Sequence, residues 1–163
     1  LASQRHKFKG MINFGSGAEA ERTKDIMTMK EEQFLSDKQI PSDYYGFSKY
    51  MIAKRIQQIN DNIYNFRIFN VFGELEKENR MIKNNANLHK TNQPLQIHQN
   101  KIMDFFSVED LYRVVKHYLN YKNLKIIFNT DGMSPAYCGN GEKLKNLKID
   151  LVGLEKSIKS LYG

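Results

Sequence analysis

Apolar residues recur along the chain with two different periods. Residues 10–14, "GMINF", form a short apolar run ending at a Gly-Ser-Gly turn, which predicts a β-strand. Residues 44–60 instead carry apolar side chains every three or four positions, which predicts a helix. The apolar positions of that helix are Phe47, Met51, Ile52, Ile56 and Ile59. Residues 64–73, rich in aromatic and β-branched side chains, predict a second strand that stops at Gly73.

The second half of the chain continues the alternation. Residues 78–90 predict a helix, and 94–98 and 103–106 predict short strands. A further strand is expected at 124–132, and an amphipathic helix at 153–163. Alternating strands and helices indicate an α/β domain with a parallel sheet. A chain of 163 residues is long enough for one domain with a sizeable core.

The helix expected at 107–121 has a recognisable start. Ser107 is followed three residues later by Asp110, which is a capping signal. Its apolar face is marked by Leu111, Val114, Val115, Tyr118 and Leu119.

Composition and charge narrow the possible partners. The net charge of +7 favours anionic ligands, but the basic residues are scattered and form no nucleic-acid module, so we expect no nucleic-acid partner. No apolar run approaches the roughly 20 residues that span a bilayer, so no membrane partner is expected. The N-terminus lacks a signal-peptide core, and Cys138 is the one cysteine, so a reducing cytoplasm is the simplest location. The four histidines share no ligand spacing, and we expect no metal site.

Three segments place polar side chains in a site-like order. Ser16 follows the first strand, Tyr45 and Lys49 lie one helical turn apart on the next helix, and Asn70 ends the following strand. Ligands of open α/β sheets bind at the carboxyl ends of the strands. Each residue alone is more often structural: a turn serine, a surface pair, a strand-end cap. Arg67 can contact a phosphate, but a strand-edge ion pair is the interpretation we favour.

These segments resemble the extended short-chain dehydrogenase/reductase family, the NAD-dependent nucleotide-sugar epimerases and dehydratases. "YGFSK" is similar to its Tyr-x-x-x-Lys element, "INFGSGAE" to its serine-bearing strand end, and "FRIFNVFG" to its strand leading to asparagine and glycine. "MDFFSVEDL" resembles its Arg-Asp-Phe-x-x-Val-x-Asp element, and "GLEKSIKSLYG" its C-terminal helix. The resemblance implies a Rossmann-like fold, NAD or NADP as cofactor, and a nucleotide-activated sugar as substrate.

The resemblance also implies roles for individual residues. An unperturbed tyrosine is a poor base at neutral pH, and a nearby ammonium favours the phenolate. Tyr45 would move the proton of a sugar hydroxyl, Lys49 would supply the charge and hold the nicotinamide ribose, and Ser16 would hydrogen-bond the reacting oxygen. The cofactor would also meet Phe14 and Gly15, and the substrate Asn70 and Lys101.

The chain departs from the family pattern in three places. No glycine-rich pyrophosphate turn occurs, so we expect 1–73 to be the second half of a Rossmann-like domain. Residues 74–163 would then form a mixed substrate-binding region with a returning strand and the C-terminal helix. Met103 stands where the family commonly has an arginine. Gly17 and Ala18 stand where dehydratases carry an acid pair, and Ala18 where one epimerase branch has a cysteine.

The remaining set of Ser16, Tyr45 and Lys49 suits hydride transfer at one carbinol, most simply C4. This predicts a dehydrogenase, reductase or 4-epimerase of surface-polysaccharide sugars. The helix at 44–60 would place Tyr45, Lys49 and Ile52 toward the sheet, and its other face would form a homodimer. The alternative is a truncated, non-catalytic domain that binds a sugar nucleotide or a partner chain.

Overall fold

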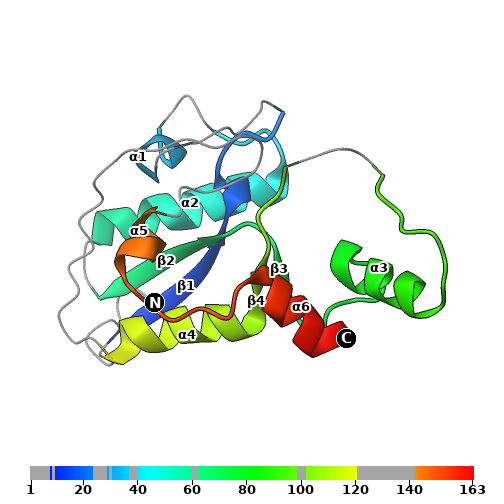
Figure 1. Ribbon diagram of the computed structural model, residues 1–163. Helices are drawn as coiled ribbons and strands as arrows, with labels where there is room; N and C mark the ends of the chain where they lie inside the picture. The colour runs from blue at the N-terminus through cyan, green and yellow to red at the C-terminus, as the bar shows by residue number, and fades with distance from the viewer. Residues whose placement is uncertain are drawn as a thin grey trace.

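The computed structural model describes residues 8, 10–23, 29, 31–36, 40–59, 62–98, 102–120 and 142–163. Three features expected from the sequence lie outside these residues: Lys101, Cys138 and the strand at 124–132. Figure 1 shows the arrangement, with a short sheet between helices.

The sheet is parallel, as the alternating pattern predicted. Strand β1 (Met11–Ser16) pairs in parallel with β2 (Ile63–Ile68), with Met11 opposite Ile63 and Ser16 opposite Ile68. Parallel neighbours need a long crossover, which the intervening helix-bearing segment supplies. A second parallel pair joins β3 (Val71–Phe72) to β4 (Phe106–Ser107).

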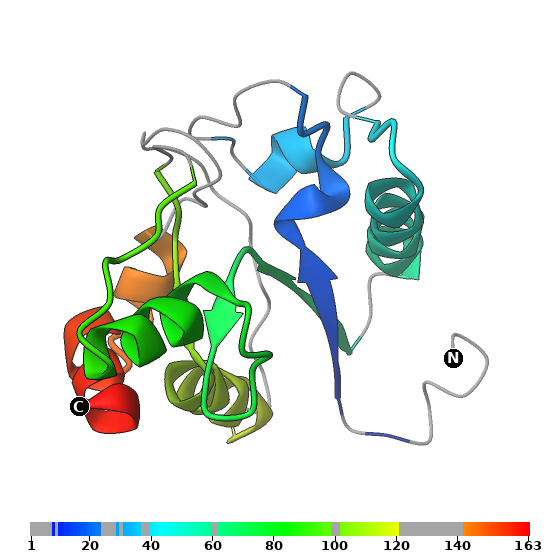
Figure 2. The same ribbon diagram turned by 90° about the vertical axis from the view of Figure 1, so that its right-hand side faces the viewer.

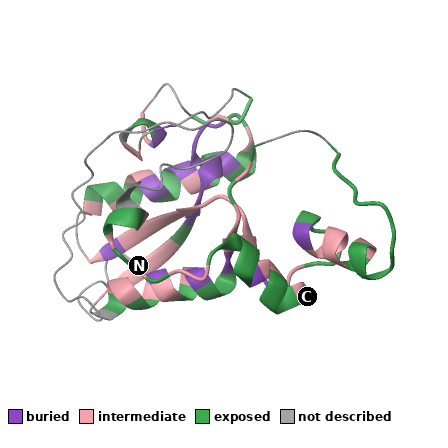
Figure 3. Cartoon of the chain, viewed as in Figure 1, coloured by how far each residue is buried: buried purple, intermediate pink, exposed green. Residues whose placement is uncertain are grey.

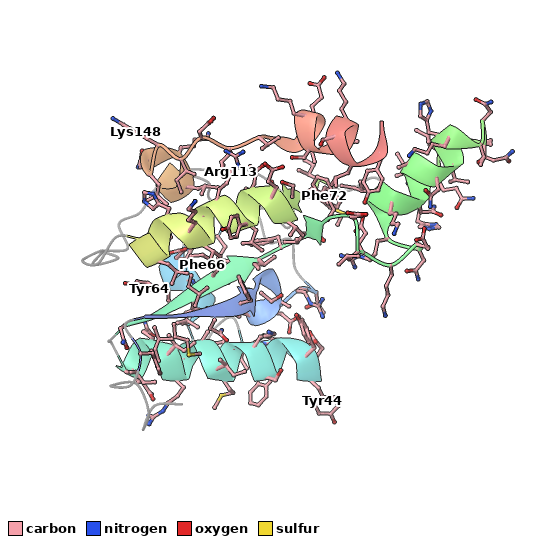
Figure 4. The ribbon with its side chains drawn as sticks, turned by 90° about the horizontal axis from the view of Figure 1, so that it is seen from below. Tyr44, Tyr64, Phe66, Phe72, Arg113 and Lys148 are labelled. Carbon is pink, nitrogen blue, oxygen red and sulfur yellow. The ribbon has the colours of Figure 1, made fainter. Side chains whose placement is uncertain are left out.

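Two helices cover opposite faces of the β1–β2 sheet. Helix α2 (Tyr44–Ile59) lies on one face and α4 (Val108–Asn120) on the other, as Figures 1 and 2 show. On the α4 side, the ring of Tyr118 packs edge-on against Tyr64 and Phe66 of β2, with centroids 5.5 and 4.9 Å apart. The two β2 rings point toward α4 in Figure 4. Helix α4 therefore joins the second half of the chain to the sheet of the first.

The face of α2 that meets the sheet differs from the one predicted. Its buried residues are Gly46, Tyr50 and Ala53. The periodic apolar residues Phe47 and Met51 are about half exposed, and Ile52 is 45% exposed. The prediction that Ile52 faces the sheet was wrong. The small residues Gly46 and Ala53 let the helix lie close to its neighbours, Tyr50 is the large side chain buried on this face, and Phe47, Met51 and Ile52 stay outside.

The shorter elements complete the body. They are the 3₁₀ helix η2 (Gly17–Glu19), α1 (Glu31–Phe34), α3 (Met81–Lys90), α5 (Glu142–Asn146) and α6 (Leu154–Tyr162). A buried cluster of Ala20, Met29 and Phe34 lies beside η2, and Phe69 packs edge-on against Phe34 at 6.3 Å. This cluster packs just beyond the carboxyl end of β1, since Ala20 directly follows η2.

Several element boundaries differ from the prediction. The strand expected at 64–73 is interrupted at Phe69 and Asn70, because the chain there leaves the first sheet to enter the second. The prediction of a strand at 94–98 was wrong, since this segment is irregular and exposed throughout. Only Phe106 of the strand expected at 103–106 pairs with a neighbour. The helix predicted at 78–90 begins at Met81.

The capping signal of α4 was predicted correctly in part. Ser107 Oγ accepts a hydrogen bond from the Asp110 backbone N–H at 3.1 Å. The Asp110 carboxylate does not return to Ser107; it accepts from the backbone N–H groups of Val152 and Gly153 at 2.6 and 3.0 Å. Asp110 thereby anchors the C-terminal segment to α4. Within the described residues, no helix is both long and apolar enough to cross a membrane.

Candidate active site at the carboxyl end of the first strand

Ser16 ends β1 and also caps the short helix that follows. Its Oγ accepts a hydrogen bond from the Ala18 N–H at 3.1 Å, and the side chain is buried. Because Oγ accepts this bond, its own proton stays available for a second partner. Ser16 can therefore cap the turn with its oxygen and at the same time donate its hydroxyl proton to a bound ligand.

The start of α2 is fixed by Asp43. Its Oδ1 accepts from the Gly46 N–H at 2.8 Å and its Oδ2 accepts from Arg22 at 2.9 Å. The Gly46 N–H, helped by the Arg22 guanidinium, holds the pKa of the Asp43 carboxyl below its ordinary value. This cap sets the first turn of α2, on which Tyr45 lies.

Tyr45 and Lys49 lie together, as their spacing predicted. The Lys49 ammonium is 5.9 Å from the centroid of the Tyr45 ring and donates to the Phe14 carbonyl oxygen at 3.0 Å. Tyr45 is 54% exposed and Phe14 47% exposed. An accessible phenol beside a tethered ammonium, at the end of a parallel strand, is an arrangement suited to proton transfer on a bound alcohol.

The other predicted site residues are placed less favourably for ligand contact. Gly15 is buried, and a side chain there would collide with the Asn65 amide. The Asn70 side chain donates to the Asp104 backbone carbonyl at 2.9 Å, and the Asn70 backbone carbonyl accepts from the Phe106 N–H at 2.9 Å. Asn70 therefore links the two strands of the second sheet, in keeping with its interpretation as a strand-end residue.

The sequence analysis missed the role of Glu19. Its carboxylate forms an ion pair with Arg67, with Oε2 and Nε 2.7 Å apart, and the two side chains are 0% and 9% exposed. The favoured interpretation of Arg67 as an ion-pair residue was correct. The local role of Glu19 had a sequence signal, because Ser16 followed three residues later by Glu19 is a capping-box pattern, but this pattern does not indicate the pairing with Arg67.

The described residues hold no group of three or more histidine, cysteine, aspartate or glutamate side chains that could bind a metal ion. The local chemistry of the site is that of a hydroxyl, a phenol and an ammonium.

Comparison with known proteins identifies the family. The profile of the NAD dependent epimerase/dehydratase family matches residues 2–129, well over half of the chain. The chain belongs to this family. The resemblance to this family is thereby confirmed, and four of the five sequence elements lie within the matched residues. No curated protein matches the chain.

Solved epimerase structures share the fold. UDP-glucuronic acid 4-epimerase from Bacillus cereus in complex with NAD superposes with a TM-score of 0.65 at 16% identity, covering 99% of this chain and 65% of that one. A tyrosine-to-phenylalanine mutant of that enzyme, with UDP-4-deoxy-4-fluoro-glucuronic acid and NAD, gives 0.62 at 14% identity, covering 93% and 59%. The Rossmann-like α/β fold is confirmed, and the chain spans less than two thirds of the length of these epimerase chains.

Proposed function

We propose that the full-length protein oxidises or reduces a nucleotide-activated sugar with NAD or NADP, at one carbinol, C4. The observation that carries this proposal is the Tyr45–Lys49 pair, tethered through the Phe14 carbonyl to the strand that ends in Ser16. The family is NAD dependent, and the similar solved enzymes are named as 4-epimerases of a UDP-sugar.

The cofactor fits this arrangement of side chains. The half-exposed Phe14 and the tethered Lys49 offer a ring face and an ammonium at the carboxyl end of β1, where dinucleotides bind in such sheets. When bound, NAD or NADP supplies a nicotinamide that accepts or returns hydride. Lys49 and Phe14 would hold its nicotinamide end.

The residues of this chain would then handle the proton and the oxygen. In the oxidation direction, Tyr45 as phenolate accepts the proton of the sugar hydroxyl while hydride leaves the same carbon. The Lys49 ammonium stabilises the phenolate, and the Ser16 hydroxyl donates to the carbinol oxygen. In the reverse direction Tyr45 returns the proton. Asn70 and Lys101 would contact the substrate, with residues 74–163 forming its side of the site.

The neighbourhood of Ser16 supports a reaction that stops at hydride transfer. Gly17 and Ala18 carry no acid, and the Glu19 carboxylate is buried in its ion pair with Arg67. No carboxylate in this turn is therefore placed to expel a neighbouring hydroxyl. We propose a dehydrogenase, reductase or 4-epimerase, acting in the cytoplasm in the synthesis of surface polysaccharides.

The test is product analysis of the full-length protein in heavy water with UDP-, GDP- and dTDP-sugars and either cofactor. A 4-keto sugar, a C4 epimer or a reduced keto sugar is expected, without loss of water by mass spectrometry. Rapid dehydration, or stereospecific deuteration at C3 or C5, would contradict the assigned chemistry. Tight sugar-nucleotide binding without turnover would instead support the alternative of a non-catalytic binding domain.

We also propose a homodimer that forms through the outer face of α2. Phe47 and Met51 lie one turn apart on that face, 45% and 50% exposed, although they are large and apolar. Light scattering of the full-length protein should give twice the monomer mass at micromolar concentration. The double substitution of Phe47 and Met51 by serine should shift it to monomer, and a wild-type monomer would contradict the proposal.

A further inference from the structure

The Glu19 carboxylate is fully buried, and each of its oxygens has a protein partner. Oε1 accepts from the Ser16 backbone N–H at 3.0 Å and from the Asn65 amide at 3.1 Å. Oε2 accepts from Arg67 Nε at 2.7 Å and from the same Asn65 amide at 3.2 Å. A buried charge is tolerated when it is paired and hydrogen-bonded in this way.

The backbone around Glu19 is shaped to receive it. A Cβ atom at Gly15 would collide with the Glu19 carboxylate and lie 2.7 Å from Asn65 Oδ1. A Cβ atom at Gly17 would lie 2.6 Å from the Phe69 ring. Residues 15–17 therefore follow a path that only small residues allow, with the carboxylate folded back beneath Ser16.

The opposite side of the same turn touches the helix that carries Tyr45. A Cβ atom at Gly46 would lie 2.6 Å from the Ala18 carbonyl oxygen, so α2 rests directly on η2. Gly46 is the neighbour of Tyr45. The turn of residues 16–19 is thus held between a buried ion pair on β2 and the first turn of α2.

From this chain of contacts we propose that Glu19 is a positioning residue for the reaction assigned above, on which the proposal rests. By accepting a hydrogen bond from the Ser16 N–H, Glu19 holds the backbone that carries the Ser16 hydroxyl. By holding the turn, it also keeps the Ala18 carbonyl in contact with Gly46 and so sets the position of Tyr45. Glu19 moves no proton of the substrate, because both of its oxygens are occupied and water is excluded. Asn65 and Arg67 hold Glu19 in this position.

A double substitution separates positioning from stability. Glu19→Leu with Arg67→Met removes both buried charges together, so no uncompensated charge remains and the fold is retained. The double variant also loses the carboxylate that accepts the hydrogen bond from the Ser16 N–H in the wild-type protein. In the full-length protein we expect kcat to fall on the order of 10- to 100-fold with KM for the sugar nucleotide within a few-fold, because displacement of reacting groups by about 1 Å has effects of this size.

Amide hydrogen exchange supplies a readout independent of turnover. The Ser16 N–H should exchange slowly in the wild-type protein and much faster in the double variant. Arg67→Lys keeps a cation beside Glu19, and should retain both the slow exchange and most of the rate. Glu109→Gln, an exposed carboxylate on α4, is the control and should change neither.

Each outcome decides the proposal. A folded double variant with wild-type kcat, or with unchanged Ser16 exchange, would overturn it. If the double variant fails to fold, Glu19→Asp replaces it, since the shorter side chain cannot reach Ser16 N while facing Arg67. If the wild-type protein shows no turnover, the proposed function fails, and the exchange comparison alone decides whether Glu19 holds Ser16.

Discussion

Two regions of the molecule differ sharply in how they are held. Residues 15–20, at the end of β1, are all buried, whereas residues 91–98 are all exposed. The second region, together with α3 and the loop before it, forms an arm of residues 74–98 that extends away from the sheet in Figure 1 and has little buried surface in Figure 3. Among the described residues of α3, only Ile82 is buried.

The contacts of the two regions differ in kind. The turn at Ser16 is locked by a buried ion pair and by glycines in close contact with neighbouring groups. The arm is tied by exposed polar bonds, such as the Asn85 side chain with the Gln96 backbone at 2.7 and 3.0 Å. Regions with few buried apolar contacts open at low free energy. The comparison indicates a rigid turn at Ser16 and an adaptable arm.

The largest expected effect is on chemistry at the rigid end. Tyr45→Phe in the full-length protein should lower turnover roughly 100- to 10,000-fold, the range for loss of one proton-transfer group. Sugar-nucleotide affinity, measured by calorimetry, should change little. Tyr44→Phe is a matched control, because Tyr44 is 95% exposed and points away from the sheet (Figure 4), and it should be silent. A Tyr45→Phe variant with most of its rate would remove Tyr45 from its role.

The next effect is on stability. Arg67→Met leaves the Glu19 carboxylate buried without a cation, and should lower the free energy of unfolding by about 3–5 kcal/mol. Lys90→Met, an exposed cation at the end of α3 in the arm, should change it by less than about 0.5 kcal/mol. Urea unfolding of both variants measures the contrast. Equal losses would mean that the two regions are held with similar strength.

A smaller loss is expected at the contact between η2 and α2. Gly46→Ala would gain about 1 kcal/mol from helix propensity. The Ala18 carbonyl, 2.6 Å from the new Cβ, is backbone and cannot move cheaply, so we expect a net loss of about 1–3 kcal/mol. Gln57→Ala, at an exposed position of the same helix, serves as the reference. Thermal unfolding that finds Gly46→Ala more stable than wild type would show that this contact is loose.

In the arm, a substitution should act locally. Asn85→Ala removes both bonds to Gln96 and should accelerate protease cleavage within residues 91–98, with a global stability loss of about 1 kcal/mol or less. Asn87→Ala is the control, since the Asn87 side chain bonds Glu78 and not the exposed segment. Equal cleavage rates for the two variants would show that the Asn85–Gln96 hydrogen bonds do not specifically hold the segment of residues 91–98.

The smallest effect is a pH dependence near the start of α2. The Glu21 carboxylate accepts backbone N–H bonds from Thr23 and Ser42, which lower its pKa from an ordinary 4.5 to about 2. Because the folded pKa is depressed, this contribution is complete above pH 4.5 and is lost as the pH falls toward 2. Glu21→Gln should flatten the acid side of the stability curve slightly. Superimposable curves would show that Glu21 contributes nothing.

Much of the fold could be predicted because its elements follow local rules. The strand ending at Gly-Ser-Gly, the helix carrying Tyr45 and the Ser107 cap all depend on near neighbours in sequence. The failures have long-range causes. Residues 94–98 look like a strand, but they pair with no other strand among the described residues. The buried face of α2 was missed because Gly46 and Ala53 give a weak hydrophobic period and leave Tyr50 as the one large side chain on that face.

The site was predictable to a similar degree. The Tyr45–Lys49 pair follows from one turn of helix, and the structure brings the two side chains together. The partner of Arg67 could not be chosen from periodicity, because Glu19 lies 48 residues away in the sequence. The bond from Asn70 to the Asp104 carbonyl likewise depends on the pairing of two distant strands.

The bond between Lys49 and the Phe14 carbonyl has a consequence for the entropy of ligand binding. A free lysine side chain carries roughly 2 kcal/mol of rotamer entropy. In this protein the ammonium is already directed at a strand carbonyl, so much of that ordering is complete once the chain has folded. A ligand that reaches Lys49 meets a preorganised charge, and ordering the side chain subtracts less from its affinity. An arginine at this position would keep the charge. Its planar guanidinium has several donors, however, and would match the single Phe14 carbonyl less well than the compact lysine ammonium does.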